Sequence, residues 1–495
     1  MSYVKNLEVD EIRCGFLVTS DRKRLWNVQI ELILELQRIC EKYNLKFLAS
    51  KGTLLGAARH GGFIPWDDDV DIMMPRSDYE KFKLIARDEI HYPFYFDLWY
   101  ENEDPPGNEN GYPLLPFAKL RDMRTLQIQR PNYKNLRQGI WIDIFPIDSI
   151  PNFDNSPNKN ELDLKFKLIE QFLAATCLRD GRHLDIIEKI FRDSEISREE
   201  ILQIPLRIRG KMLDDLLASL DQNSRYVNPL VIDTIVANVD IRQNREWFDE
   251  TIYLPFEEIS LPAPKHFDEI LTNDYGNWRK FEILGYHSKI YSADISYDDY
   301  LSVKNSARTK LNSDEMRNGK LVTTWRKKIW KSQLDLILEL KRVCEKFNLR
   351  FWATSSTLFA AAKFHGFNPE DDFITLEMTR EDFEKLEFHF PFRLVENRLM
   401  DERTMMIEDF EKLDRPNGIF IEIKIAEQIP DEIEYLPFEF TSIPVPKNYE
   451  EVLKNLFEHY PNIEIARRFP SLVVSADVSY HEFYSETERM KKCHT

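Results

Sequence analysis

An internal repeat limits how this chain can fold more than any other feature of its sequence. The segment DEIRCGFLVTSDRKRLWNVQIELILELQRICEKYN, which begins at Asp10, recurs at Asp314 as DEMRNGKLVTTWRKKIWKSQLDLILELKRVCEKFN. The alignment runs without a gap to Phe82 and Leu386, and about half of the aligned positions are identical. Because self-similarity on this scale indicates repeated structural units, the sequence predicts two copies of one domain in tandem.

Later segments repeat in the same order. GIWIDIFPID from Gly139 corresponds to GIFIEIKIAE from Gly418, and YLPFEEISLPAPKHFDEIL from Tyr253 corresponds to YLPFEFTSIPVPKNYEEVL from Tyr435. The second copy is shorter, since it has no counterpart to a helical insertion at about 158–225.

We therefore predict a first domain over residues 1–301, a polar linker over 302–313 (SVKNSARTKLNS) and a second domain over 314–495. The helical insertion belongs to the first of these domains. A chain of 495 residues agrees with this division, because it is too long to form one ordinary hydrophobic core.

Hydrophobic periodicity indicates the secondary structure of the first copy. WNVQIELILELQRICEKYN has the spacing of an amphipathic helix, with one apolar face formed by Val28, Leu32, Leu36 and Ile39. KFLAS predicts a short buried strand, and GTLLGAARHG predicts a turn that opens a helix ending at Gly61 and Gly62. Alternating helices and strands of this kind indicate an α/β or α+β sheet domain.

Alternation of polar and apolar residues predicts two strands that carry acidic side chains. DVDIMM from Asp69 alternates acidic and apolar residues, as a strand with one face in a cleft does. GIWIDIF repeats the alternation and places Asp143 on a polar face between Trp141 and Phe145. Asp69 and Asp71, one residue apart, are expected to project to the same side of their strand.

Carboxylates held this close repel one another unless a cation lies between them. Paired oxygen ligands suit Mg²⁺ or Mn²⁺, which keeps some water and takes its remaining ligands from substrate phosphates. We predict that Asp69 and Asp71 bind such an ion, that Asp67 adds a ligand or holds a water, and that Asp143 is the third carboxylate of the site. The alternative for a lone D-x-D is a solvated acidic turn.

Several residues around these acids are candidates for binding a phosphorylated donor. Gly52 and Thr53 follow a buried strand at a helix start, where backbone N–H groups favour anions. Arg59 could pair with a phosphate, although its stem could equally cover the helix surface. The predicted donor-binding residues are Lys51, Gly52, Thr53, His60, Lys119 and Arg121, with Arg59 among the catalytic residues. For His60, Lys119 and Arg121, a structural or surface role is the alternative.

Composition excludes other classes of protein. The formal net charge of −18 repels phosphate backbones and argues against nucleic-acid binding. Five scattered cysteines without a C-x-x-C pair argue against a disulfide framework or a structural zinc site. The sequence has no apolar run of the roughly 18 residues that a spanning helix needs and no signal-peptide pattern at its start. We expect a cytoplasmic protein, with peripheral attachment to the inner face of a membrane and a homo-oligomeric state both compatible with the sequence.

The motifs together closely resemble those of the LicD family. They are GTLLGAARHGGFIPWDDDVDI, KLRD, GIWIDIFPID and LPFEEISLPAPKHFDEILTNDYGNW, and they cover roughly residues 10–280, with a weaker match over 314–460. That family includes bacterial phosphorylcholine transferases and is related to fukutin and fukutin-related protein. The resemblance implies an α+β fold, with a nucleotidyltransferase-like mixed sheet flanked by helices and duplicated in tandem.

The resemblance also implies an activity. Members of the family move a phospho-alcohol from a CDP-linked donor to a sugar hydroxyl, so we expect Mg²⁺ at Asp69 and Asp71, a CDP-alcohol donor (CDP-choline being favoured) and a glycan acceptor. Attack at the phosphorus that bears the alcohol would release CMP, and attack at the nucleotide phosphorus would transfer CMP; only the resemblance favours the first. A nucleotidyl- or glycosyltransferase and a non-catalytic glycan-binding scaffold are the alternatives.

The second copy lacks the residues assigned to metal chemistry. Over the gap-free segment from Asp10 to Phe82, an offset of 304 (314 − 10) relates the two copies, so Asp69 corresponds to Phe373 and Asp71 to Thr375. Gly52, Arg59 and His60 are replaced as well, by Ser356, Lys363 and Phe364. Arg76 recurs as Arg380, which favours a structural role for it. We predict that the second copy is a pseudoenzyme domain that clamps the acceptor, completes the cleft or mediates dimerisation.

Overall fold

The computed structural model describes residues 2–14, 16–101, 116–128, 138–150, 159–178, 180–192, 194–221, 223–230, 242–280, 290–292, 313–390, 394–407, 418–459 and 473–475. The chain divides into two compact units. The first unit comprises Met1–Lys5 and Arg24–Tyr297, and the second comprises Asn6–Lys23 and Asp298–Thr495. Residues 302–312 of the predicted linker lie outside the described residues.

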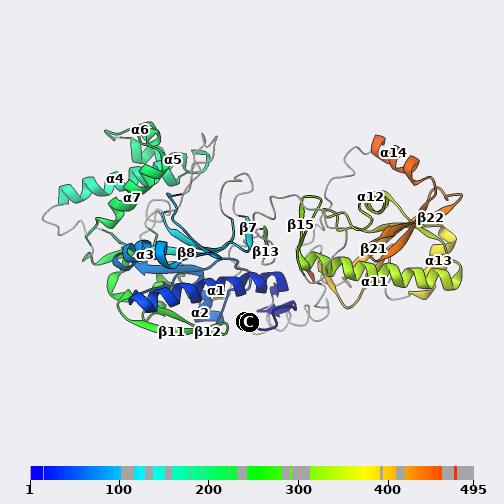
Figure 1. Ribbon diagram of the computed structural model, residues 1–495, viewed down its shortest axis with the longest axis horizontal. Helices are drawn as coiled ribbons and strands as arrows, with labels where there is room; N and C mark the ends of the chain where they lie inside the picture. Colours follow the sequence, from blue (N-terminus) through cyan, green and yellow to red (C-terminus); the bar gives the residue numbers. More distant parts are fainter. Residues whose placement is uncertain are drawn as a thin grey trace. The chain divides into compact units, whose positions relative to one another are not determined.

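A mixed sheet forms the centre of the first unit (Figure 1). Its described strands are β3 (Leu48–Ala49), β4 (Asp71–Pro75), β5 (Phe94–Asp97), β6 (Ala118–Asp122), β8 (Ile140–Ile150), β9 (Tyr226–Asn228) and β10 (Gln243–Asn244). The order β3-β4-β8-β6-β5 crosses one half of the sheet, and the far end of β8 pairs with β9, which pairs with β10. Of these pairs, β4 and β8 run parallel and the others antiparallel.

Helices flank this sheet. They are α1 (Ser20–Tyr43), α2 (Lys51–His60), α3 (Arg76–Glu89) and α9 (Phe267–Tyr275). The apolar face predicted for α1 is confirmed, because Val28, Leu32, Leu36 and Ile39 are all buried. The hairpin of β11 (Thr251–Phe256) and β12 (Ile259–Pro264) precedes α9, after the 3₁₀ turn η2 (Arg245–Phe248). Strand β7 (Leu126–Ile128) pairs with β13 (Ile290–Ser292).

The region predicted as a helical insertion contains four helices. They are α4 (Lys159–Cys177), α5 (Asp180–Phe191), α6 (Arg198–Gln203) and α7 (Leu206–Ala218). Figure 1 shows them gathered at one end of the first unit, away from α1. Helix α6 begins with a capping box, in which the Ser197 side chain and the Glu200 side chain satisfy each other's backbone N–H groups.

The second unit has its own mixed sheet, in the order β16-β17-β21-β19-β18. These strands are β16 (Phe351–Ala353), β17 (Thr375–Met378), β18 (Leu394–Val395), β19 (Arg398–Asp401) and β21 (Ile419–Ile425). Its helices are α11 (Thr324–Phe347), α12 (Ser355–Phe364), α13 (Arg380–His389) and α14 (Tyr449–His459). Two-stranded pairs complete it: β1 (Glu11–Arg13) with β2 (Phe16–Val18), β14 (Glu315–Arg317) with β15 (Lys320–Val322), β20 (Met405–Ile407) with β24 (Val473–Ser475), and β22 (Ile433–Phe438) with β23 (Thr441–Pro446).

The central strands of the two units correspond residue by residue. Asp71 of β4 faces Asp143 of β8, and at the same place in the second unit Thr375 of β17 faces Glu422 of β21. The prediction of an α+β fold with mixed sheets flanked by helices is therefore confirmed. Among the described residues, no helix combines the length and the apolar character that crossing a membrane requires.

Candidate active site

Helix α2 begins directly after β3, and its first turn reaches the start of β4. The Ser50 N–H donates to the Asp71 carbonyl at 3.0 Å. The buried hydroxyl of Thr53 accepts the Asp71 N–H at 2.8 Å. Two hydrogen bonds thus hold the backbone of Asp71 against the amino-terminal end of α2.

Gly52 allows the acidic residues to approach this helix end. A Cβ atom added at Gly52 would lie 2.8 Å from Oδ2 of Asp67 and 3.7 Å from Oδ2 of Asp71. The first of these distances is too short for a carbon–oxygen contact without movement of the carboxylate. The absence of a side chain is therefore a requirement of the site as it stands, and Ser356 occupies the equivalent position in the second unit.

Polar side chains from other elements hold the backbone of the acidic segment. Trp26 Nε1 of α1 donates to the Asp67 carbonyl at 3.0 Å. The side-chain amides of Gln29 and Gln127 donate to the Asp68 carbonyl at 2.9 and 3.1 Å. Oxygen atoms of Asp67, Asp68 and the following Asp69 lie within 4.8 Å of one another. The sequence analysis did not identify Trp26, Gln29 or Gln127, because nothing local in the sequence relates them to the acids.

One expectation about this segment is wrong. Strand β4 begins at Asp71, so Asp69 lies in the irregular segment before the strand and not on it. Asp69 reaches the site through the fold of that segment rather than through strand alternation. Asp68, which the sequence analysis left out, is completely buried among the clustered acids.

The crowding of these acids changes their ionisation. Burial raises the pKa of Asp67 well above its ordinary value, and the negative charges of Asp69 and Asp71 raise it further. Burial likewise raises the pKa of Asp71, and the charges of Asp69 and Asp143 add to this effect. A positive charge placed among these carboxylates would relieve both the desolvation and the mutual repulsion.

Asp143 lies opposite Asp71 on the neighbouring parallel strand. The sequence analysis assigned both carboxylates to one site but did not predict that their strands are adjacent. Asp143 forms an ion pair with Lys119, which faces it from β6. The expectation of a polar strand face around Asp143 is wrong, because alternation along β8 puts Trp141 and Phe145 on the same face as Asp143. The Lys119 ammonium lies 4.6 Å from the centre of the Trp141 ring. Burial lowers the pKa of Lys119, and the Asp143 carboxylate opposes that shift.

Lys51 is the second cation near these acids. It opens α2 with a φ of +42°, a left-handed conformation that is costly for a residue with a side chain. Ser355 has a φ of +51° at the same place in the second unit, so the bend belongs to the shared fold. The Lys51 ammonium lies 5.9 Å from the centre of the Phe145 ring, and its charge and that of Lys119 lower the pKa of Asp71 against the larger effect of burial.

Arg59 and His60 end α2 and join it to the segment after α9. The Arg59 guanidinium donates to the carbonyls of Trp278 and Lys280 at 3.0 and 3.2 Å, and its Nε donates to His60 Nε2 at 3.0 Å. The His60 ring lies edge-on to Trp66. Both side chains therefore have partners within the protein. For His60, these contacts agree with the alternative of a structural role.

Arg121 has its contacts away from the acidic cluster. Its guanidinium forms a buried ion pair with Asp97 at 2.6 Å and donates to the Gly139 carbonyl at 3.3 Å. The ring of Trp141 lies beneath it, with 5.1 Å from Cζ to the ring centre. The described contacts of Arg121 are therefore those of the scaffold.

Tyr275, the last residue of α9, is a further residue near the site. Burial raises the pKa of its hydroxyl, and the charges of Asp71, Asp274 and Asp67 raise it further. It lies in the NDYGNW segment, more than two hundred residues from Asp67 along the chain, so only the fold relates the two. Its side chain is partly exposed, and the charges of the acidic cluster act on its hydroxyl.

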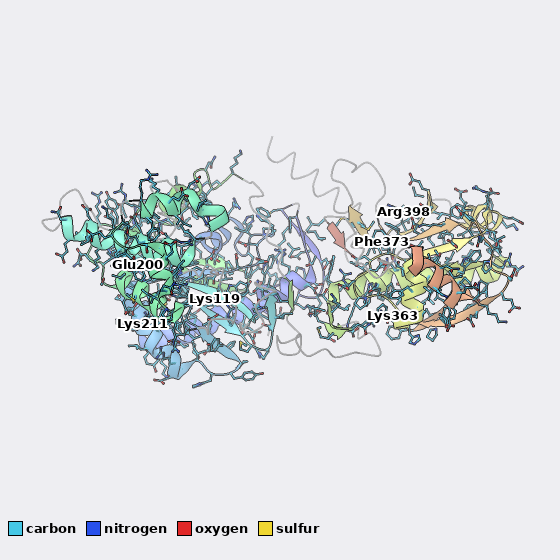
Figure 2. All side chains as sticks on the ribbon, turned by 90° about the horizontal axis from the view of Figure 1, so that it is seen from above. Lys119, Glu200, Lys211, Lys363, Phe373 and Arg398 are labelled. Atoms are coloured by element: carbon cyan, nitrogen blue, oxygen red, sulfur yellow. The ribbon has the colours of Figure 1, made fainter. Side chains whose placement is uncertain are left out.

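The same position in the second unit is built differently. The Thr375 N–H is held by Thr357 Oγ1 at 2.8 Å, as Asp71 is held by Thr53, but the Thr375 hydroxyl donates to Glu422 at 3.4 Å. Phe373 and Arg398, labelled in Figure 2, belong to this part of the second unit. Both contact the ring of Phe420. Asp372, the counterpart of Asp68, forms an ion pair with Arg326.

Comparison with known proteins gives the site a family context. Residues 44–173 match the family model described as LicD/FKTN/FKRP, nucleotidyltransferase domain, and this range contains the acidic segment, Lys119 and Asp143.

The lipopolysaccharide cholinephosphotransferase LicD of Haemophilus influenzae is 36% identical to the chain over 250 residues, which is 49% of this chain and 85% of that protein. Uncharacterized proteins of Rickettsia typhi and Rickettsia prowazekii are 42% and 44% identical over 62 and 61 residues, 12% of this chain and 17% and 19% of theirs. Because the Haemophilus protein is matched over most of its length, the chain belongs to the LicD family.

Proposed function

We propose that this protein is a phosphotransferase that moves phosphocholine, or a closely related phospho-alcohol, from a CDP-linked donor to a hydroxyl of a surface glycan or its precursor, with release of CMP. The observation that carries the proposal is the convergence of Asp67, Asp71 and Asp143 beside the amino-terminal end of α2. The named activity of the Haemophilus relative supports the choice of phosphocholine and of a glycan.

A hard divalent cation, Mg²⁺ or Mn²⁺, is the second part of the proposal. The donor set is all carboxylate, and oxygens of Asp67, Asp68 and Asp69 lie within 4.8 Å of one another, with Asp71 beside Gly52 at the same helix end. Burial and mutual repulsion raise the pKa values of Asp67 and Asp71, which is the situation that a bound cation relieves. Asp67, Asp69 and Asp71 would hold the ion. When bound, it would supply charge stabilisation at the pyrophosphate oxygens of the donor.

The remaining residues have separate tasks in this proposal. Lys51, at the amino-terminal end of α2, binds the donor phosphates together with the backbone N–H groups of that helix end. The acceptor hydroxyl attacks the phosphorus that bears the alcohol, and the bond from that phosphorus to the CMP oxygen breaks. Asp143 accepts the proton of the attacking hydroxyl, and the Lys119 ammonium keeps the Asp143 carboxylate ionised before the reaction.

We also propose that the chain arose by tandem duplication and that its second copy, over 314–495, no longer performs the reaction. The matching strand order and register of the two units support the first statement. Phe373 and Thr375, in place of two carboxylates, support the second.

Donor turnover by the full chain tests the function. CDP-choline, CDP-ethanolamine, CDP-glycerol and CDP-ribitol are each incubated with the protein, Mg²⁺ and a glycan fraction, and nucleotide release is followed by chromatography. The proposal predicts CMP release with one of these donors, with CDP-choline the first expectation, and a glycan whose mass increases by the matching phospho-alcohol. A glycan that gains a nucleotide or a sugar would contradict it.

A further inference from the structure

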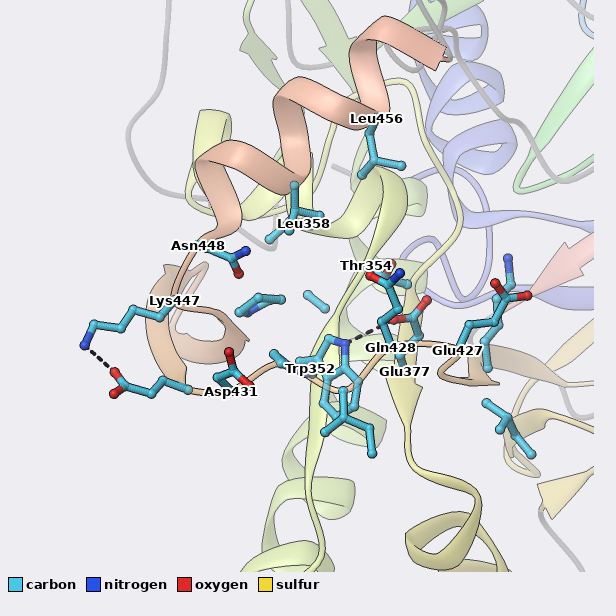
Figure 3. Close-up of a pocket in the computed structure, with 18 residues that line it drawn as sticks. Trp352, Thr354, Leu358, Glu377, Glu427, Gln428, Asp431, Lys447, Asn448 and Leu456 are labelled. Carbon is cyan, nitrogen blue, oxygen red and sulfur yellow. Dashed lines mark hydrogen bonds and ion pairs between the residues drawn. The ribbon is translucent and has the colours of Figure 1, made fainter.

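A cavity of about 890 Å³ opens in the second unit, on the side of the sheet where β21 ends. Strands β16 and β17, the loop over residues 427–432 and the start of α14 form its walls (Figure 3). Its volume lies within the range of roughly 300–1,000 Å³ that is typical of sites for small ligands. The acidic cluster of the first unit has no part in it.

The first unit fills the corresponding space. There β8 continues to Ile150 and pairs with β9, and β10 follows. Gln243 of β10 donates to the Asp274 side chain of α9 at 2.7 Å, so β10 lies against that helix. The counterpart of Asp274 is Leu456, which lines the cavity in the second unit. Strand β21 ends at Ile425, and the described residues of the second unit include no strand in the place of β9 or β10.

The wall of the cavity has a polar pair where the first unit has an apolar one. Leu48 and Met73 face each other across β3 and β4 and are 0% and 1% exposed. Their counterparts are Trp352 and Glu377, which face each other across β16 and β17. The Trp352 indole N–H donates to Glu377 Oε2 at 3.1 Å (Figure 3). A carboxylate held by an indole N–H at a cavity wall is oriented in advance to accept hydrogen bonds from a ligand.

The charges of the lining exclude an anionic ligand. Each lysine that lines the cavity has a carboxylate partner: Lys447 pairs with Glu432, and Lys424 lies 3.5 Å from Glu422. The carboxylates that line the cavity are Glu377, Glu427, Asp431 and Glu432, against the two lysines. A nucleotide or a phosphate would therefore meet net repulsion, so the cavity does not suit the CDP-linked donor.

The neutral polar groups favour a sugar over a simple ammonium ion. Gln428 and Asn448 bring side-chain amides to the lining, and Thr354 brings a hydroxyl that makes no capping hydrogen bond to α12. These groups both donate and accept, which matches sugar hydroxyls, whereas a primary ammonium only donates and the quaternary ammonium of choline does neither. The Trp352 ring is 2% exposed, so its face is not open to a cation.

We propose that this cavity binds an uncharged sugar unit, and that the second unit thereby holds the glycan acceptor. The role in holding the glycan acceptor rests on the proposed function, whereas the binding of a sugar unit does not. Glu377 accepts from the sugar hydroxyls, the amides of Gln428 and Asn448 complete the polar contacts, and the side chains of Leu358 and Leu456 contact the apolar face of the ring.

Saturation-transfer NMR on the full chain tests the site, with glucose, galactose, N-acetylglucosamine, N-acetylgalactosamine and lactose as probes and choline and CMP as comparison ligands. We expect transfer to at least one of the sugars, with Kd raised at least about tenfold by Glu377→Met, which restores the first-unit residue. Asn448→Trp, placed on the exposed rim, should abolish binding by filling the cavity. Glu450→Gln removes an exposed carboxylate in the first turn of α14 that does not line the cavity, and it should leave binding unchanged.

Two results would overturn the proposal. One is sugar binding that Glu377→Met and Asn448→Trp leave intact, or no sugar binding at all. The other is a choline signal that both variants remove while the sugars give none, which would make the cavity an ammonium site. CMP release from the donor, measured in parallel, separates the two proposals. Sugar binding without CMP release from any donor would support the sugar site in the cavity but overturn the proposed reaction.

Discussion

At the start of the central parallel strands, the first unit places Asp71 opposite Asp143, and the second unit places Thr375 opposite Glu422. The strand backbone is held in the same way in both, by a threonine hydroxyl 2.8 Å from the N–H. Because this support persists where the acid is absent, it belongs to the fold. Under the proposed function, the carboxylates, which differ between the units, are the part that serves the reaction.

The cation opposite each acid gives a second comparison. Lys119 faces Asp143 and lies over Trp141, and Arg398 faces Glu422 and lies over Phe420. A cation, a carboxylate and an aromatic ring are therefore kept together in both units. The comparison teaches that the first task of Lys119 is to compensate the charge of Asp143, with donor binding at most an additional one.

The largest effect is expected from exchanging the residues that distinguish the two units. Asp71→Thr gives the first unit the residue of the second, and CMP release should fall at least several hundredfold because a central carboxylate is lost. Thr375→Asp makes the reverse change and should leave the rate unchanged. Steady-state CMP release measures both effects. If the rate of Thr375→Asp fell as far as that of Asp71→Thr, the assignment of the reaction to the first unit alone would be contradicted.

A smaller loss is expected at Gly52. Gly52→Ser introduces the residue found at position 356, and its Cβ would lie 2.8 Å from Oδ2 of Asp67. Displacement of that carboxylate should lower CMP release by about tenfold to a hundredfold with little change in melting temperature. Ser356→Gly is the matched control and should have no effect on turnover. Wild-type activity in Gly52→Ser would show that the acids need not approach the helix end.

Arg76 and Arg380 occupy equivalent positions in the repeat, but they should contribute differently to the stability of the fold. Arg76 is buried and forms ion pairs with Asp148 at 2.6 Å and with Asp214 of α7 at 2.8 Å, whereas Arg380 is exposed. Arg76→Met should lower the free energy of unfolding by about 3–5 kcal/mol, because it leaves the buried Asp148 carboxylate without its cation and Asp214 with Lys83 alone. Arg380→Met should change it by less than about 0.5 kcal/mol. Denaturant unfolding measures the two, and equal effects would contradict this account.

The smallest effect is one that the two units should share. Thr53→Ala and Thr357→Ala each remove the hydroxyl that accepts a strand N–H. Each should cost about 1–3 kcal/mol of stability, since a buried N–H loses its acceptor. Urea unfolding of both variants checks the prediction, and a loss confined to Thr53→Ala would show that the support is specific to the first unit.

Periodicity predicted much of this molecule because the relevant contacts are local. The buried face of α1, the short strand β3 and the end of α2 at Gly61 follow from spacing and from a glycine in the left-handed conformation. The sequence analysis assigned Asp71 and Asp143 to one site on two strands, whereas the pairing and the register of those strands required the structure.

The remaining features depend on contacts between distant segments. Arg76 recurs as Arg380, yet its buried partner Asp214 comes from the insertion that only the first copy has. Arg121 looked like a phosphate ligand until its buried partner Asp97 was visible. Tyr275 reaches the acids only because α9 packs beside α2. In each case the partner lies on another element, so neither composition nor spacing could identify it.

The central claim is that the cation-binding carboxylates lie in the first unit alone. Titration of the full chain with Mn²⁺, followed by electron paramagnetic resonance, tests it most directly. We predict one tight class of site in the wild type, lost when Asp69→Phe and Asp71→Thr are combined to copy the second unit and retained in Asp371→Asn. Tight Mn²⁺ binding that survives the double substitution would contradict the account.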